Sequence, residues 1–144
     1  MEIKNRSAYF EYFIDDKYVA GIMLTGTEVK SLREGKANFN DSYCIFHNGE
    51  LWIRSFYISE YSHGTVNNHD PIRERKLLLN RRELKKMEAK LKEKGYTIVP
   101  LRLFFNEKNL AKLEIGLGKG KKLHDKRESI KQRDVQREIK RYIK

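Results

Sequence analysis

The sequence predicts an α+β fold that is mainly β: an OB-like closed antiparallel β-barrel with short helices and a basic C-terminal tail. Short aromatic and β-branched runs between turn residues predict strands in hairpins, and two helical patterns interrupt them. The chain has no regular strand–helix–strand alternation, which argues against a doubly wound nucleotide-binding sheet. Apolar content falls abruptly after Leu117. We therefore expect one folded domain over 1–118 and a separate tail over 119–144.

The first two strands are predicted from aromatic and branched residues. Residues 8–14 and 18–24 are both β-prone, and Asp15-Asp16-Lys17 between them is typical of a turn. Gly21 inside the second run indicates a bulge or a sharp bend of the kind that closes a small barrel.

A short helix follows over residues 26–34. Thr25 and Glu28 have the spacing of a capping box, in which each side chain accepts a hydrogen bond from the other residue's backbone amide. The apolar side of this helix should fill the core, so Lys30 and Arg33 are expected to face outward.

The next element is a hairpin. Strands over 43–47 and 51–58 flank Asn48-Gly49, the strongest short-range hairpin signal. The polar stretch 59–71 is interpreted as a loop.

The C-terminal half of the domain is predicted to contain a helix and two strands. Asn80 and Glu83 make a second capping pair, at the start of a helix over 81–94 whose apolar residues recur at helical spacing. Strands over 97–105 and 110–117 complete the domain, and Pro100 indicates an edge position or a bulge.

Charge is the strongest compositional signal. There are 31 Lys and Arg against 20 Asp and Glu, for a net charge of +11. Residues 72–94 carry ten basic against four acidic residues, and residues 119–144 carry eleven against four. Two dense basic segments on an otherwise balanced chain indicate a nucleic-acid partner, RNA above all.

The cluster Arg73, Arg75 and Lys76 is predicted to contact phosphate, because Lys and Arg clusters supply most nucleic-acid affinity. The alternative is a solvated surface supported by pairs such as Glu88–Lys92 on the following helix.

The residues offer no sign of an enzyme, a metal or a cofactor. The single Cys44 excludes an internal disulfide and fits a reducing cytoplasm. Four histidines, His47, His63, His69 and His124, lack the spacing of a zinc site. Paired catalytic carboxylates and a glycine-rich phosphate loop are also absent from the sequence, and its glycines at 116, 118 and 120 are interpreted as a hinge.

The tail keeps only a few apolar residues, and they recur at approximately helical spacing: Ile130, Val135, Ile139, Tyr142 and Ile143. A helix this basic is unstable alone. Our hypothesis is that the tail is disordered when free and becomes helical against RNA, where phosphates relieve the charge repulsion.

Three segments carry a family resemblance: TGTEVKSLR from Thr25 to Arg33, DPIRERKLLL from Asp70 to Leu79, and GKGKKLHDKR from Gly118 to Arg127. Together, and in this order, they resemble the SsrA-binding protein (SmpB) family over about Asn5 to the low 130s. The resemblance implies a non-enzymatic OB-type protein that binds the tRNA-like domain of transfer-messenger RNA (tmRNA). It also implies delivery with elongation factor Tu to stalled ribosomes for trans-translation, with the tail in the decoding centre and empty mRNA channel of the small subunit.

The resemblance also implies the site residues. Those expected to bind RNA are Asn5, Arg6, Glu28, Lys30, Arg33, Lys36, Arg73, Arg75 and Lys76. Those expected to bind the ribosome are Lys119, Lys121, Lys122, His124, Asp125, Lys126, Arg127, Lys131 and Arg133. Phe10 stands where the family commonly has His, so stacking would replace a polar RNA contact there. We expect a cytoplasmic monomer without a membrane partner.

Three alternatives remain at this point. A ribosomal protein with the same barrel and tail would bind ribosomal RNA directly. A ribosome-rescue peptidyl hydrolase would need a Gly-Gly-Gln loop, which the sequence lacks. A membrane-surface protein would need Trp, Phe or Leu to insert beside its charges, and the basic tail has none after Leu123.

Overall fold

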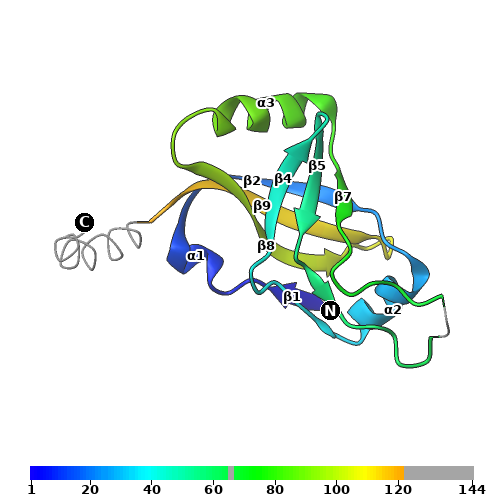
Figure 1. The fold of residues 1–144 in the computed structure, drawn as a ribbon. Helices are drawn as coiled ribbons and strands as arrows, with labels where there is room; N and C mark the ends of the chain where they lie inside the picture. Colours follow the sequence, from blue (N-terminus) through cyan, green and yellow to red (C-terminus); the bar gives the residue numbers. More distant parts are fainter. Residues whose placement is uncertain (65–66, 122–144) are drawn as a thin grey trace.

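The computed structural model describes residues 1–64 and 67–121, which fold into an antiparallel sheet with three short helices (Figure 1). In chain order the elements are β1 (Glu2–Lys4), α1 (Ala8–Glu11), β2 (Tyr12–Ile22), α2 (Gly26–Arg33), β3 (Ala37–Asn38), β4 (Tyr43–His47), β5 (Glu50–Arg54), β6 (Tyr57–Ile58), β7 (Arg75–Leu78), α3 (Arg81–Leu91), β8 (Tyr96–Phe105) and β9 (Ala111–Gly120). The hypothesis of a tail that becomes helical concerns residues that lie outside the described ranges.

The strands follow one another in a ring. Seven of them form one sheet in the order β1-β8-β4-β5-β7-β2-β9, and β8 also pairs with β9. The seam between β4 and β8 is narrow, with only Cys44 and Ile98 in register. The mainly β fold with short helices is confirmed, and closure into an OB-like barrel stays a prediction.

The prediction of a turn at Asp15-Asp16-Lys17 is wrong. Strand β2 runs without interruption along β9, and the extra residue is absorbed by a register shift between Ile14 and Asp16. A continuous partner strand keeps the chain extended where the local sequence favours a turn.

Gly21 is not the site of a bulge, because it is in register with both Leu78 and Lys112. The bulge predicted at Pro100 is confirmed by a register shift between Pro100 and Arg102.

Residues 8–11 form a helical turn, α1, where a strand was predicted. The Ser7 carbonyl accepts hydrogen bonds from the amides of Phe10 and Glu11. Ala8 is the buried residue of this turn and packs against Val99 and Leu101. A small residue at the contact lets the turn lie close to β8, and tertiary packing here outweighs β propensity.

Both capping boxes are confirmed, at Thr25 with Glu28 and at Asn80 with Glu83. The hairpin turn at Asn48-Gly49 is confirmed as well, and both residues have positive φ (54° and 78°). Strand β5 ends earlier than predicted, at Arg54, and Tyr57–Ile58 forms a separate short sheet with β3.

Strand β7 had no counterpart in the sequence prediction. It lies between β5 and β2, with Ile53 opposite Arg75 and Ile22 opposite Leu77. A half-buried strand usually shows apolar residues at every second position. In β7 one of the buried positions is an arginine, so this alternation cannot be recognised in the sequence.

The core fills the inside of the ring. Leu32 of α2 and Met87 of α3 are fully buried in the same cluster as Ile53, Leu103 and Ile115 from the strands. The expectation that the first predicted helix fills the core is therefore confirmed. The helices lie at different places around the sheet, with α1 and α2 on opposite sides of it in Figure 1.

The glycines near the end of β9 are part of the sheet. Gly116 and Gly118 are buried, and a Cβ on Gly118 would lie 2.2 Å from the carbonyl oxygen of Phe13. Their role is close strand packing, so the interpretation as a hinge is wrong for these two positions. Strand β9 continues to Gly120, two residues beyond the expected end of the domain.

Candidate nucleic-acid interface

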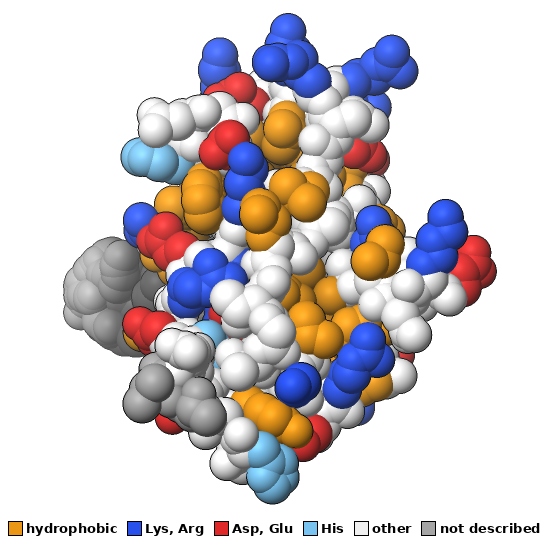
Figure 2. Space-filling model, turned by 90° about the vertical axis from the view of Figure 1, so that its right-hand side faces the viewer, with side chains coloured by type: hydrophobic (Ala, Val, Ile, Leu, Met, Phe, Trp, Pro, Cys, Tyr) orange, Lys and Arg blue, Asp and Glu red, His pale blue; other side chains and the backbone are white. Residues whose placement is uncertain are grey.

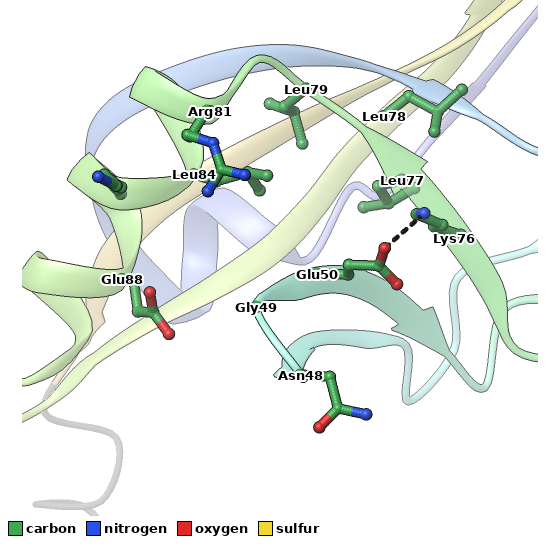
Figure 3. A pocket seen from close by; sticks show the side chains of 11 residues that line it. Asn48, Gly49, Glu50, Lys76, Leu77, Leu78, Leu79, Arg81, Leu84 and Glu88 are labelled. Atoms are coloured by element: carbon green, nitrogen blue, oxygen red, sulfur yellow. Dashed lines mark hydrogen bonds and ion pairs between the residues drawn. The ribbon is translucent and has the colours of Figure 1, made fainter.

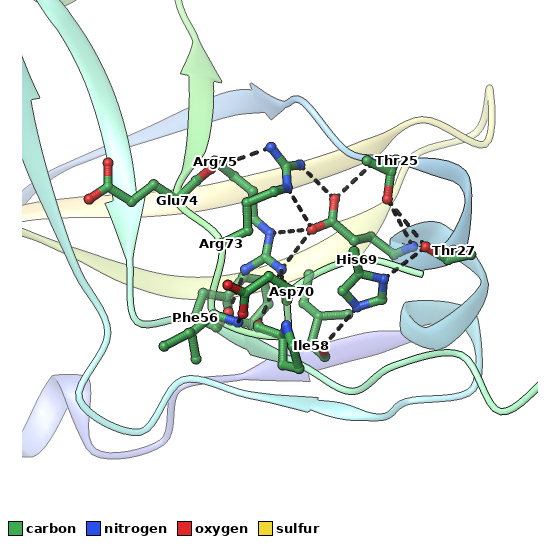
Figure 4. A network of polar contacts seen from close by, with 12 residues as sticks. Thr25, Thr27, Phe56, Ile58, His69, Asp70, Arg73, Glu74 and Arg75 are labelled. Atoms are coloured by element: carbon green, nitrogen blue, oxygen red, sulfur yellow. Dashed lines mark hydrogen bonds and ion pairs between the residues drawn. The ribbon is translucent and has the colours of Figure 1, made fainter. Parts of the chain in front are cut away.

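A buried carboxylate joins α2 to β7 (Figure 4). Glu28 Oε1 accepts from the Thr25 amide at 2.8 Å and from Arg73 Nη2 at 2.7 Å. Its Oε2 accepts from Arg73 Nε at 3.1 Å and from Arg75 Nε at 2.7 Å. We call these four residues, Thr25, Glu28, Arg73 and Arg75, the Glu28 clamp. It fixes the start of α2 to a segment about 45 residues away in sequence.

Arg75 donates its hydrogen bonds to groups inside the protein. Its side chain is fully buried; Nη1 donates to the Phe56 carbonyl, and Nη2 donates to the Pro71 carbonyl at 3.2 Å. Together with Arg73 and Lys76 it was predicted to contact phosphate. The structure gives Arg75 no surface for that contact, because the alternation of β7 turns it inward toward Glu28. Arg73 keeps 37% of its side chain exposed.

The clamp keeps Glu28 ionised. Burial by itself would raise the pKa of the Glu28 carboxyl, but hydrogen bonds from Arg73 and from the Thr25 amide, with the charge of Arg75, outweigh it and hold this pKa below its usual range. Burial lowers the pKa of the Arg75 guanidinium, and Glu28 opposes that shift. A carboxylate between two guanidiniums is a fixed polar network that supports the surface around it.

His69 ties α2 to the loop before β7. The Thr27 hydroxyl lies 2.8 Å from Nδ1, and Nε2 lies 2.9 Å from the Ile58 carbonyl oxygen. Because a carbonyl can only accept, Nε2 carries the proton in the neutral ring, and Nδ1 then accepts from the Thr27 hydroxyl. Sequence reasoning considered His69 only as a metal ligand. In the described part of the chain, no group of three or more His, Cys, Asp or Glu could hold a metal ion.

The outer side of α2 presents cations beside aromatic rings. Lys30 and Arg33 are exposed, as predicted from the helical spacing. Lys30 Nζ lies 5.5 Å from the centre of the Tyr61 ring, and the Arg33 guanidinium lies 4.4 Å from that of Phe105. Lys36, just beyond the helix, is also exposed. These cations can meet phosphates while the rings offer faces for bases.

The N-terminal pair has two different roles. Asn5 is half-buried, and its Nδ2 donates to the Pro100 carbonyl at 2.8 Å, so it anchors the segment before α1 to β8. Arg6 is exposed and free to contact a partner's surface.

Lys76 lies beside a groove of about 470 Å³ between the β4–β5 turn and α3 (Figure 3). Its Nζ is 2.7 Å from Glu50 Oε2, which neutralises it in the free protein. Leu77, Leu79 and Leu84 are among the residues that line this groove. Lys76 would have to exchange Glu50 for a phosphate in order to bind RNA.

At the end of β9 the basic tail leaves the sheet. Lys119 is exposed, with Nζ 5.2 Å from the centre of the Tyr96 ring. Lys121 donates from its backbone amide to the Glu11 carbonyl at 2.8 Å. The other predicted tail residues lie outside the described ranges: Lys122, His124, Asp125, Lys126, Arg127, Lys131 and Arg133.

The surface combines basic and apolar groups. Figure 2 shows Lys and Arg side chains at the top of the view and scattered over the rest of a face whose centre exposes hydrophobic side chains. Val19, Met23 and Leu78 are exposed by 48–51%. Within residues 1–64 and 67–121, no helix is long and apolar enough to cross a membrane.

Comparison with known proteins decides the family. The sequence model described as "SmpB protein" matches residues 2–144. The SsrA-binding protein of Phocaeicola vulgatus is 56% identical over 144 residues, covering all of this chain and 96% of that protein. The chain belongs to the SmpB family.

Other SmpB-family proteins agree. The SsrA-binding protein of Bacteroides thetaiotaomicron is 54% identical over all of this chain and 96% of its own length. A solved structure described as "tmRNA-SmpB: a journey to the center of the bacterial ribosome" contains a chain that is 48% identical. It superposes with a TM-score of 0.70 over 83% of this chain and 84% of its own.

Sequence reasoning missed several residues of the surface around α2. Tyr61 and His69 lie in a stretch that was interpreted only as a loop, and Thr27 was not singled out. The available signal was local: a polar loop that contains His and Tyr directly before the DPIRERKLLL segment. Their partners on α2 and β6 are set by the tertiary fold, so the sequence could not pair them.

Proposed function

We propose that the protein binds the tRNA-like domain of tmRNA and delivers it to stalled ribosomes for trans-translation. The Glu28 clamp is the observation that carries this proposal. It fixes α2 and the start of β7 in one geometry and leaves Lys30, Arg33 and Lys36 exposed, with Lys30 beside Tyr61 and Arg33 beside Phe105. A rigid, basic and partly aromatic surface suits a folded RNA, which is recognised by shape and backbone more than by base sequence.

Each residue of this surface has a definite task in the proposal. Lys30, Arg33, Lys36 and the exposed part of Arg73 contact phosphates. Glu28 and Arg75 position them from inside and contact no RNA. Membership of a family whose relatives are named SsrA-binding proteins supports tmRNA as the RNA.

The tail carries the second half of the proposal. Residues 119–144 hold eleven basic residues and begin at the end of β9, on the opposite side of the sheet from α2. The tail would occupy the decoding centre and the empty mRNA channel while the body holds tmRNA. The protein acts as a monomer, and elongation factor Tu joins through the tmRNA complex.

A gel-shift titration tests the RNA preference. The protein is titrated against the tRNA-like domain of tmRNA, with ordinary tRNA and a matched duplex as competitors, at physiological salt. We expect the tRNA-like domain to be bound in preference to both competitors. Equal and steeply salt-sensitive binding to all three would contradict the proposal and favour a general ribosomal-RNA binder.

A further inference from the structure

The bulge in β2 leaves one residue without a partner in the β2–β9 register. Ile14 is in register with Gly118 and Asp16 with Leu117, so Asp15 is the extra residue. An extra residue in one strand of a pair often re-aims a side chain toward a new contact. Neither the core nor the Glu28 clamp uses Asp15, so the contact that this carboxylate makes calls for another explanation.

Asp15 meets a tyrosine from the far side of β9. The Tyr96 hydroxyl donates a hydrogen bond to Asp15 Oδ2. Tyr96 begins β8 and is in register with Lys119 of β9, which is itself in register with Phe13 of β2. Because β9 lies between β2 and β8, this hydrogen bond joins the two outer strands across the end of the middle one. We call the side chains of Tyr96 and Asp15 the β9 strap.

Further contacts hold the Tyr96 side chain. Lys90 Nζ lies 4.9 Å and Lys119 Nζ 5.2 Å from the centre of its ring, within the range of cation–π attraction. The hydrogen bond to Asp15 raises the pKa of the Tyr96 hydroxyl above its usual value, so this group is protonated and donates at neutral pH. Tyr96 therefore connects β2, α3 and the last residues of β9.

The residue that follows β9 is held as well, by α1. The Lys121 amide donates to the Glu11 carbonyl at 2.8 Å, and Lys121 Nζ donates to the Tyr9 carbonyl at 2.8 Å. The chain thus has defined partners up to the point where the rest of the basic tail begins. The ends of strands open more readily than their centres, so contacts at this point decide how far β9 stays in the sheet.

We infer that Tyr96 and Asp15 are positioning residues for the basic tail, because they hold the end of β9 between its neighbours. The inference rests on the proposed function, in which the body holds tmRNA while the tail enters the decoding centre. A tethered segment reaches its target at an effective concentration that depends on where it is anchored and on the length of its flexible part. Opening of the β9 end would lengthen that part and lower this concentration.

The test compares three variants with the full chain. Tyr96→Phe removes only the hydroxyl and keeps the ring beside both lysines. Asp15→Ala removes the acceptor, and the double variant removes both. Tyr57→Phe is the matched control, because it removes the hydroxyl of an exposed tyrosine (40%) on β6, away from the β9 strap.

The first measurement is hydrogen exchange of the Lys121 amide by NMR, without RNA. We expect exchange to be roughly two- to tenfold faster in Tyr96→Phe, the factor that corresponds to the net contribution of one hydrogen bond. Asp15→Ala should give a similar increase. The double variant should match the single variants, since all three lose the same contact. Tyr57→Phe should exchange as the unmodified protein does.

The second measurement is peptide tagging in a reconstituted reaction with limiting protein. Tyr96→Phe should lower the tagging rate roughly two- to tenfold, in proportion to the opening of the β9 end. Its affinity for the tRNA-like domain should equal that of the unmodified protein, because the surface around α2 is unchanged. Tyr57→Phe should be unchanged in both tagging and affinity.

Four results would overturn the inference: unchanged Lys121 exchange in Tyr96→Phe, faster exchange with unchanged tagging, additive effects in the double variant, or an equal loss of affinity for the tRNA-like domain. The last of these would indicate a general loss of structure. If the unmodified protein shows no preference for the tRNA-like domain, the proposed function fails, and the exchange data still report on the strap. If tagging and preference hold while Tyr96→Phe changes nothing, the strap alone fails.

Discussion

At the scale of single residues, Glu28 shows how one side chain serves local and tertiary structure together. Its spacing from Thr25 predicted a helix cap, and the cap is present. The same carboxylate also accepts from Arg73 and Arg75, which no local pattern indicates. Local hydrogen bonds can be read from spacing, whereas a partner about 45 residues away depends on the fold.

Glu28→Gln should destabilise the protein by about 3 kcal/mol at neutral pH, because it leaves the buried Arg75 cation without a counter-charge. Urea unfolding of this variant and of Glu34→Gln, an exposed control next to α2, measures the difference. The pKa of the Glu28 carboxyl is lowered in the folded state, so its stabilising contribution is complete above about pH 4.3, the usual value for an unfolded Glu. As the pH falls further, the gap between protein and variant should narrow. A gap below about 0.5 kcal/mol at neutral pH would mean that the clamp does not hold Glu28.

At the scale of elements, strong local signals predicted best. Both capping boxes, the Asn48-Gly49 hairpin and the Pro100 bulge rest on chemistry within a few residues. The failures are α1, the uninterrupted β2 and the whole of β7. Each is decided by a neighbouring strand or core contact, which a single sequence does not display.

The cations on α2 and just after it are exposed, whereas Arg75 of β7 is buried. Replacing Lys30, Arg33 and Lys36 by Ala, one at a time, should lower the salt slope of binding to the tRNA-like domain by about 0.7–0.9 for each phosphate that the variant no longer neutralises. Their folding stability should hardly change, because the side chains are exposed.

Arg75→Ala should behave in the opposite way. Its salt slope should stay close to that of the unmodified protein while its unfolding midpoint falls, since a buried partner of Glu28 is gone. Lys92→Ala, in the exposed C-terminal turn after α3, is the control for both measurements. An α2 variant with an unchanged slope would remove that residue from the interface.

At the scale of the whole molecule, the sheet separates the residues of the proposed RNA surface from the start of the basic tail. The Glu28 clamp and α2 lie on one side, and α1 with the end of β9 lies on the other (Figure 1). The sequence shows which segments are densely basic, because charge density is visible without a fold. It could not predict that Arg75 is buried or that Tyr9, Phe10 and Phe13 are exposed, since burial is decided by strand register.

This arrangement predicts where the tail can be removed without disturbing the folded domain. The protein that ends at Lys121 keeps all of β9 and the hydrogen bond from the Lys121 amide to Glu11. It should therefore keep the affinity of the full chain for the tRNA-like domain while losing peptide tagging on stalled ribosomes.

A protein that ends at Gly118 should lose more than the tail. It lacks the Phe13–Lys119 and Tyr12–Gly120 pairs of β9 with β2, and also the hydrogen bond from the Lys121 amide to the Glu11 carbonyl at the end of α1. We expect a lower unfolding temperature for this shorter protein than for the one that ends at Lys121. Gel shifts, thermal unfolding and a reconstituted tagging reaction compare the two truncations with the full chain. If ending at Lys121 already abolishes binding to the tRNA-like domain, then residues 122–144 contribute to tmRNA recognition, and the proposed division between body and tail is wrong.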